Sequence, residues 1–430
     1  MRTEKTFGIG RSLLLAGAVA AAWAVQGVPA NAVVLGLACG FEGRDYELCK
    51  DAAEIWAART GNTVLTYPIP DDLAERLALF SAVLSEDVPK FDVISAEVTS
   101  AAALADDLLS LGDYLPYAAY GQSETMIRQL TIGGELKGLP FYQEMGGLYY
   151  RTDLLEKYGV EVPESWGELE AAARLIQDGE RAEGNDAFWG YLFQGGLGEA
   201  LAANATEWMV SHSGEPIVGS RGVDLTDPRY IEGLQMAAGW VGTISPPEVL
   251  SFDEEAARAL FQRGNAAFMR NLPYAFPLLE SPISAVSGKV GAAFMPSAHD
   301  NPPVSLLEGW SMVVARGSPH PAEAAFLADF LTSVAQQRMR ALEADFFPSQ
   351  VVLFSDTEVS THFPLVDTYE LIEANIRMRP AHLIGKGYAE GSKVFQEAVH
   401  AVLRGDGDAA TVMAEAQTQI REILVKARQP

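Results

Sequence analysis

The chain has 430 residues, of which 48% are hydrophobic, and this length exceeds what one compact core usually holds, so we expect two lobes. Its formal net charge is −26, whereas nucleic acids and anionic lipid surfaces attract cationic proteins, so neither is expected as a partner. We interpret the acidic balance as a source of solubility.

The N-terminal segment differs from the rest of the chain. It carries basic residues near its start, then an apolar run over residues 12–25, then the small-residue sequence Ala30-Asn31-Ala32. This order is typical of a cleavable secretory signal peptide, and the apolar run is short for a membrane-spanning helix. We therefore exclude residues 1–32 from the fold and expect export to the periplasm.

The first part of the mature chain alternates short apolar runs with amphipathic segments. This β-α-β-α-β order predicts a parallel sheet that binds ligands at the carboxyl ends of its strands. The loop 40–45 and Glu97 both fall at that edge. The expected strands are residues 33–37, 63–67 and 91–95, and the expected helices are residues 46–59 and 71–84.

The sequence holds two cysteines, Cys39 and Cys49. In an oxidising compartment an even pair favours a disulfide, and a bridge from a strand end to the following helix is sterically allowed; two unpaired thiols are the alternative. Neither cysteine has metal-ligand spacing around it. Leu37-Ala38-Cys39 is similar to a lipoprotein box, but lipidation there would remove the first strand, so we expect no lipid anchor.

The segment 139–167 carries the strongest pattern in the sequence and reads LPFYQEMGGLYYRTDLLEKYGVEVPESWG. An acidic residue, Glu144, precedes the pair Gly146-Gly147, and an aromatic strand follows. Thr152 suits the N-cap of the next helix. A strand that passes from one packed unit to another beside a carboxylate and glycines is typical of a hinged ligand cleft.

This segment resembles the hinge of bacterial extracytoplasmic solute-binding proteins of sugar ABC importers, family 1, in the trehalose/maltose-binding branch. A similar run in that family reads LYYRKDLLEKYG, and here it is Leu148–Gly159. Residues 263–276 resemble the aromatic wall of the family's sugar cleft, with Leu272 at a usual tryptophan position. Residues 308–314 resemble a returning strand, with Glu308 in place of glycine.

The resemblance covers nearly all the mature chain and implies a two-lobed α/β periplasmic-binding-protein fold of type II, maltose-binding-protein-like. Each lobe is then expected to be a mainly parallel sheet flanked by helices, with the ligand cleft between the lobes. The expected first lobe comprises residues 33–142 and 297–347, and the second comprises residues 143–296 and 348–430.

A sugar site needs aromatic faces for the ring and planar polar side chains for adjacent hydroxyls. By the resemblance, Glu97 and Glu144 match acidic positions of the family, and Arg379 matches an arginine of a late loop. The remaining candidates are aromatic residues, first-loop residues and polar residues of the second lobe. The full expected ligand-binding set is Glu97, Tyr142, Glu144, Tyr274, Trp310, Arg379, Glu42, Arg44, Asp45, Gln194, Glu199 and Glu308.

The function that the resemblance implies is capture of a neutral sugar, such as trehalose, maltose or sucrose, and its delivery to an ABC permease in the inner membrane. A monomer that needs no cofactor is expected. The lost wall tryptophan at Leu272 favours one alternative, a polyol or glycosylated osmolyte as ligand. A structural protein of the cell envelope would have no use for a hinge.

A second class of function is an exported carbohydrate-active enzyme, in which Glu97 and Glu144 would act as an acid–base pair. The resemblance to binding proteins argues against it. The sequence has no Gly-x-Ser-x-Gly elbow and no phosphate-binding Gly-x-x-x-x-Gly-Lys loop. Its six histidines are scattered without paired-ligand spacing, so neither a zinc site nor histidine catalysis is expected, and no EF-hand-like calcium loop is visible.

Overall fold

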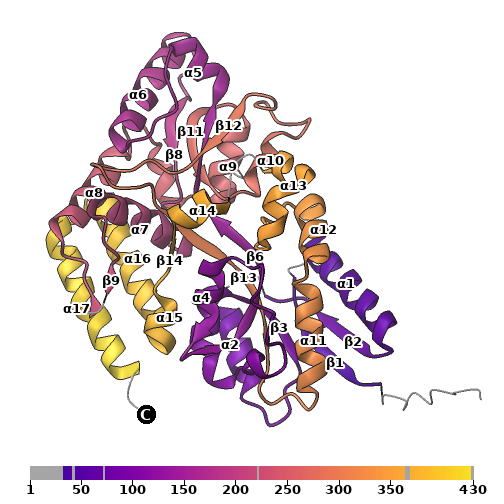
Figure 1. Cartoon of the computed structure of the whole chain (residues 1–430). Coiled ribbons are helices and arrows are strands. Elements are labelled where there is room, and N and C mark those ends of the chain that lie inside the picture. The colour runs from indigo at the N-terminus through magenta and orange to yellow at the C-terminus, as the bar shows by residue number, and fades with distance from the viewer. Residues whose placement is uncertain (1–31, 41–43, 71–72, 220–221, 364–368, 428–430) are drawn as a thin grey trace, which may run out of the picture. The chain divides into compact units, whose positions relative to one another are not determined.

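Two β-sheets organise the chain, and helices lie along both of them (Figure 1). The computed structural model describes residues 32–40, 44–70, 73–219, 222–363 and 369–427. Residues 1–31 of the expected signal peptide and Glu42 lie outside these residues. From Val33 onward the described chain forms one compact unit.

The first sheet has six strands, in the order β14-β13-β3-β1-β2, with β6 also paired to β13. Strands β2, β1 and β3 run parallel, as the alternating pattern predicts, whereas β13 runs antiparallel to β3 and β6. The strands are β1 (Val34–Ala38), β2 (Thr63–Tyr67), β3 (Val93–Glu97), β6 (Gly138–Met145), β13 (Ser305–Val314) and β14 (Ile376–Met378).

The second sheet has four strands in the order β12-β7-β11-β8. The expectation of a mainly parallel sheet is wrong here, because β7 is antiparallel to both β11 and β12, and only β8 and β11 are parallel. The strands are β7 (Gly147–Arg151), β8 (Trp189–Leu192), β11 (Ala266–Asn271) and β12 (Val290–Ala293).

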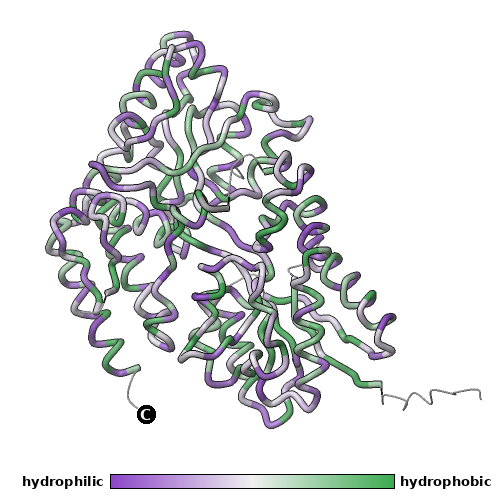
Figure 2. The backbone as a smooth tube through the Cα atoms, in the orientation of Figure 1, coloured by the Kyte–Doolittle hydropathy of each residue, from purple (hydrophilic) through white to green (hydrophobic). Residues whose placement is uncertain are grey.

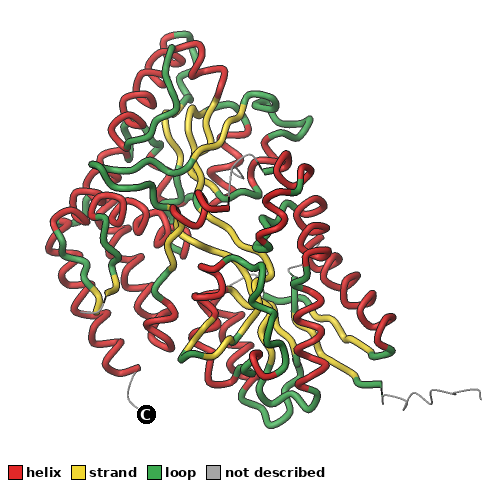
Figure 3. Tube along the Cα trace, viewed as in Figure 1, coloured by secondary structure: helices red, strands yellow, loops and turns green. Residues whose placement is uncertain are grey.

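One set of helices packs on the first sheet or against the helices that cover it (Figure 3). Helices α1 and α11 pack against each other and against strands of this sheet, and α3 and α4 pack beside β13 and β6. The helices are α1 (Arg44–Thr60), α2 (Leu73–Leu84), α3 (Val98–Leu104), α4 (Glu124–Leu130), α11 (Pro321–Leu331), α12 (Val334–Ala344), α13 (Thr357–His362), α14 (Tyr369–Asn375) and α15 (Ala381–Ile384).

The remaining helices belong with the second sheet, and several begin at side-chain caps. Ser165 and Glu168 form a capping box on α6, and Asp253 accepts a hydrogen bond from Ala256 N at the start of α9. The helices are α5 (Thr152–Tyr158), α6 (Trp166–Ala182), α7 (Glu199–Ser213), α8 (Pro228–Trp240), α9 (Glu254–Gln262), α10 (Ala275–Leu279), α16 (Tyr388–Arg404) and α17 (Ala409–Ala427).

Apolar cores lie beside each sheet, and a further core contains side chains of both, such as Val313 of β13 and Met269 of β11. Beside the first sheet Leu35 and Leu37 pack with Trp56 of α1, and beside the second Trp208 and Trp240 meet edge to face. Outer helices such as α1 and α17 alternate hydrophilic and hydrophobic residues along their length (Figure 2). Among the described residues, no helix combines the length and the apolar composition that crossing a bilayer requires.

Two features bear on the expected lobe boundaries. Strands β6 and β7 belong to different sheets, and only Gly146 separates them, so the chain changes sheet within one residue. Strand β14 joins the first sheet beside β13, although the sequence analysis assigned residues 348–430 to the second lobe. A three-residue strand with mixed polar and apolar side chains gives little pattern from which to assign its sheet.

Smaller ribbons complete the fold. Strands β4 (Thr131–Ile132) and β5 (Glu135–Leu136) form the hairpin before β6, and β9 (Val218–Gly219) pairs with β10 (Gly222–Val223).

The structure joins Cys39, after β1, to Cys49 of α1 in a disulfide, and both residues are fully buried. Replacing both cysteines by alanine should lower the free energy of unfolding by about 2–3 kcal/mol. The crosslink closes a short loop and so reduces the conformational entropy of the unfolded chain. Denaturant titration with and without reductant measures the change. Reductant should destabilise the parent protein and leave the double variant unaffected. Equal sensitivity of the two proteins would contradict the bridge.

Candidate functional site: a carboxylate-lined cleft

A cavity of about 690 Å³ opens between elements of the two sheets. This volume lies within the range of roughly 300–1,000 Å³ that is usual for small-molecule sites. Its walls combine side chains near the first sheet with loop and helix residues near the second. The lining residues are Arg76, Glu97, Gly196, Leu197, Gly198, Glu199, Ala200, Leu250, Ser251, Phe252, Asp253, Glu254, Glu308, Gln396 and His400.

Arg379 connects two of the predicted ligand residues. Its guanidinium lies 2.6 Å from Oε1 of Glu97 at the end of β3, and 2.7 Å from Oε2 of Glu199 at the start of α7. The arginine is only 2% exposed, and although burial opposes its charge, the neighbouring Tyr388, Glu97 and Glu199 raise the pKa of Arg379. The structure thus brings Glu97, Glu199 and Arg379 together at the cavity wall.

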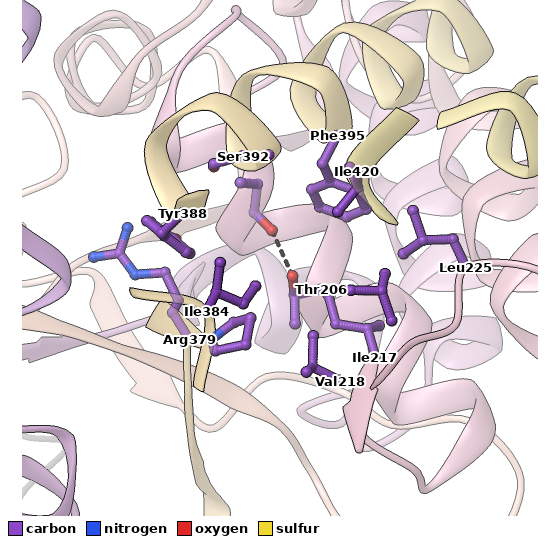
Figure 4. Close-up of a pocket in the computed structure, with 14 residues that line it drawn as sticks. Thr206, Ile217, Val218, Leu225, Arg379, Ile384, Tyr388, Ser392, Phe395 and Ile420 are labelled. Atoms are coloured by element: carbon purple, nitrogen blue, oxygen red, sulfur yellow. Dashed lines mark hydrogen bonds between the residues drawn. The ribbon is translucent and has the colours of Figure 1, made fainter. Parts of the chain in front are cut away.

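Glu199 is held by further contacts from α16. Its carboxylate accepts hydrogen bonds from Tyr388 Oη at 2.9 Å, Ser392 Oγ at 2.5 Å and Gln396 Nε2 at 2.9 Å. Figure 4 shows the apolar pocket behind this cluster, where Ile217, Val218 and Phe395 gather while the guanidinium of Arg379 points away from them. We interpret this pocket, of about 50 Å³, as packing behind the cluster.

A second arginine lies beneath the cavity. Arg270 of β11 is fully buried and contacts Glu207 of α7 through two nitrogens, at 3.0 and 3.2 Å. It also lies 3.3 Å from Glu308 of β13. Glu207 in turn accepts a hydrogen bond from the backbone N–H of Leu306 at 3.0 Å. This pair therefore links the second sheet to a strand of the first.

Gly146 makes room for the buried pair. A methyl group on this residue would lie 2.2 Å from Glu207 Oε1 and 2.9 Å from nitrogens of Arg270. The buried ion pair therefore gives a steric reason for glycine at this position of the expected hinge.

Glu144, Glu254 and Glu308 form a group of close carboxyl groups beside Arg270. Glu144 is paired directly with Glu308 across β6 and β13, so the two side chains share one face. Burial, followed by the charges of Glu308 and Glu254, raises the pKa of Glu144 well above its usual range. Burial and the charge of Glu308 likewise raise the pKa of Glu254 to about 7.

Two of the three predicted aromatic residues, Tyr142 and Trp310, stack near the first sheet. The Tyr142 ring lies 4.3 Å from that of Phe346 and 6.4 Å from that of Trp310. Arg76 of α2 covers Trp310, with its guanidinium carbon 4.7 Å from the ring centroid. Such a cation–π contact occupies one face of the ring that a sugar would otherwise use.

The other predicted residues lie in different surroundings. Arg44 is exposed and ion-paired to Glu343, and the charge of Asp45 acts on Tyr142 beside the aromatic stack. Tyr274 donates a hydrogen bond from its hydroxyl to Glu255 at 2.9 Å. Gln194 is fully buried and donates a hydrogen bond to the carbonyl oxygen of Arg270, so it helps to fix the backbone at this arginine.

Sequence reasoning missed Arg76, Glu207, Glu254 and Arg270. One signal was available, since Arg270 is a charged residue inside a strand that is otherwise buried, and a buried guanidinium requires a carboxylate partner. Glu254 and Arg76 lie on helices whose place near the cavity depends on the fold of the whole chain. Within the part of the chain that the structure describes, no group of His, Cys, Asp or Glu side chains is placed to hold a metal ion.

Replacing Arg270 by Gln should lower the free energy of unfolding by roughly 3–5 kcal/mol, because the buried carboxylates of Glu207 and Glu308 would lose their cationic partner. Arg258→Gln is the matched control, since its partner Glu255 is mostly exposed, and about 1 kcal/mol or less is expected. Chemical denaturation measures both. Equal losses for the two variants would contradict the buried pair.

The pKa of Glu254, about 7, lies above its ordinary value of 4.5, so between these values the folded state binds more protons than the unfolded state. The free energy of unfolding should therefore fall as pH rises through this window, by up to about 3 kcal/mol for this group. Denaturant titrations of the parent and Glu254→Gln between these pH values test it. The variant should show the shallower decline, and identical slopes would contradict the shift.

Comparison with known proteins places this geometry in a family. The model of the bacterial extracellular solute-binding protein family matches residues 61–338. A probable ABC transporter-binding protein of Deinococcus radiodurans is 36% identical over 377 residues, which cover 87% of this chain and 90% of the relative. A mannitol-binding protein of Pseudomonas aeruginosa is 27% identical over 244 residues, or 54% of this chain and 51% of the relative.

Among solved structures, maltose-bound MalE3 of T. maritima superposes with a TM-score of 0.80 at 29% identity, covering 91% of this chain and all of that one, 100%. This likeness confirms the expected two-lobed, maltose-binding-protein-like α/β fold with its cleft between the lobes. The chain belongs to the family of bacterial extracellular solute-binding proteins.

Proposed function

We propose that this protein is the solute-binding component of an ABC importer for a sugar or a polyol. The relative from Deinococcus radiodurans is described as an ABC transporter-binding protein, and the structural neighbour from T. maritima holds maltose. Neutral disaccharides such as trehalose, maltose and sucrose are the first candidate ligands. The permease of the importer is the proposed partner, and the protein acts as an exported monomer.

The observation that carries this proposal is the composition of the cavity wall. Glu97 and Glu199 line the cavity beside Arg379, and these planar groups can form paired hydrogen bonds to adjacent hydroxyls. Trp310 is paired with Glu97 in the first sheet, and its ring, one face of which Arg76 covers, is the aromatic surface that we propose for a sugar ring. Together they supply the two kinds of contact that a polyhydroxylated ligand requires.

The proposed mechanism is closure of the two lobes on the ligand. A ligand that touches both Glu97, near the first sheet, and Glu199, near the second, is bound better when the lobes are close together. Its differential affinity for the closed state sets how far the population shifts.

A polyol is the second candidate ligand. Leu272 stands where the related family usually has tryptophan. Its side chain is aliphatic and buried, so it offers no aromatic face to a sugar ring. An acyclic polyol needs hydroxyl partners more than a flat aromatic wall. The similarity to a mannitol-binding protein supports this alternative.

Catalysis is not part of the proposal. Glu97, one member of the acid–base pair considered from the sequence, is held in an ion pair with Arg379. The family and the neighbouring structures are those of binding proteins. A disaccharide should therefore remain intact after incubation with the protein.

Incubation with its ligand should raise the thermal unfolding midpoint of the purified protein. A ligand that binds only the folded state stabilises it by roughly 2.7 kcal/mol at a hundredfold excess over its Kd. The panel is trehalose, maltose, sucrose, mannitol and ribitol. Trp310→Ala should weaken the response, whereas Tyr120→Ala, at an aromatic residue that is 85% exposed, should not. No shift with any sugar or polyol would refute the proposed function.

A further inference from the structure

The cleft gathers more carboxyl groups than cations. Three carboxyl side chains converge beside the cavity from three different elements: Glu144 from β6, Glu308 from β13 and Glu254 from the start of α9. Glu254 and Glu308 line the cavity itself. Glu144 lies directly opposite Glu308 in the sheet, and such cross-strand neighbours have Cβ atoms roughly 4.5–5.5 Å apart.

The nearest cation, Arg270, is largely committed to another residue. It makes two contacts with the fully buried Glu207, and it contacts Glu308 only once, at 3.3 Å. One guanidinium thus lies among four carboxyl groups. The other two arginines near the cavity are also engaged, since Arg379 lies between Glu97 and Glu199, and Arg76 covers Trp310.

Glu144 adds an independent observation. Its side chain is only 6% exposed, and its Oε2 atom has no hydrogen-bond partner among the described residues. An unpartnered carboxylate oxygen in such a position is costly, and native proteins usually satisfy it. Because Glu144 is paired with Glu308 across the strands, it lies on the side of the sheet from which Glu308 lines the cavity, and its own Oε2 atom is buried next to that wall.

We propose that the cleft prefers a sugar or polyol that carries a protonated amine over the corresponding neutral compound, with the ammonium group bound among Glu144, Glu254 and Glu308. An ammonium group has three donors and no acceptor, which suits three carboxyl groups. The inference rests on the proposed function and narrows its ligand class.

The electrostatics of the surroundings agree with this placement. Glu308, Glu254 and Asp345 act on Glu144 as like charges, and only Arg270 opposes them. Glu254 faces Glu308, Arg270 and Asp253. The other charged or titratable groups around the cavity are Glu97, Glu199, Glu207, Arg76, Arg379, Tyr142, Tyr149, Tyr274 and His400.

The test compares matched ligand pairs on the unaltered protein by isothermal titration calorimetry. The pairs are glucose with glucosamine, sorbitol with 1-amino-1-deoxysorbitol, and trehalose with 2-amino-2-deoxytrehalose, and N-acetylglucosamine serves as a neutral amide. In at least one pair the amine should bind roughly tenfold or more tightly than its hydroxyl partner. N-acetylglucosamine should show no such gain.

Three variants test whether the carboxyl groups cause the preference for the amine. Glu254→Gln should abolish most of the preference for the amine, and it should change the affinity for the neutral partner much less. Glu248→Gln, which removes the same charge from an exposed residue of the neighbouring turn, should retain the preference. Glu144→Gln gives a second, nearly isosteric probe if Glu254→Gln folds poorly.

The pH dependence supplies a second readout. Binding of an ammonium group favours ionised carboxylates, so the affinity for 1-amino-1-deoxysorbitol should rise between about pH 6 and about pH 8, where its alkyl amine stays protonated. His400 also lines the cavity, so the rise must be reduced in Glu254→Gln for the assignment to Glu254 to hold.

The outcomes separate the inference from the function on which it rests. Neutral compounds that bind as tightly as their amines would overturn the inference and leave the proposed function intact. An amine preference that persists unchanged in both Glu254→Gln and Glu144→Gln would also overturn it. Absence of binding by every member of every pair would overturn the inference and the proposed function together.

Discussion

The buried ion pair between Arg270 and Glu207 is the constraint on which the centre of the molecule depends. A guanidinium without exposure persists only where carboxylates lie against it, and here Glu207 provides two contacts and Glu308 a third. The same Glu207 accepts the N–H of Leu306 at the start of β13. One helix and two strands from different sheets are therefore fixed to each other beneath the cavity.

A consequence for binding is that Glu199 and Arg379 are already partnered within the protein. Glu199 accepts hydrogen bonds from three side chains in addition to its contact with Arg379, so its orientation is set by α16. Such preorganisation lowers the entropy lost on binding. A hydroxyl group that displaces one of these partners must replace its hydrogen bond, which favours ligands with a matching pattern of hydroxyls.

The sequence predicted local elements well where the pattern depends on neighbours in the chain. The strand at Thr63–Tyr67 has the expected bounds, and α1 (Arg44–Thr60) covers the helix expected over residues 46–59, because apolar periodicity and the turns at the ends of such elements are local signals. The pairing direction of β7 was not predictable in this way, since it depends on which strands meet in space.

The candidate site likewise combines residues that the sequence predicted with residues that only the fold brings to the cavity. The resemblance to solute-binding proteins pointed to Glu97 and Arg379, and Glu199 was a further polar candidate of the second lobe; the structure brings the three together. Arg76 and Glu254 reach the cavity from helices whose orientation only the folded chain defines, and Arg44, chosen for its place in a loop, pairs with Glu343 at the surface. Proximity along the chain says little about which face of a cavity a side chain will line.

Gly146 carries a consequence for how this chain can vary among its relatives. A methyl group at this position would collide with both members of the buried pair, so the glycine and the two charged residues form one steric and electrostatic unit. An alanine at this position is compatible with folding only where Glu207 and Arg270 are replaced by smaller, uncharged side chains. These three positions should therefore covary, and a relative that has lost one of them has rebuilt the floor of its cleft.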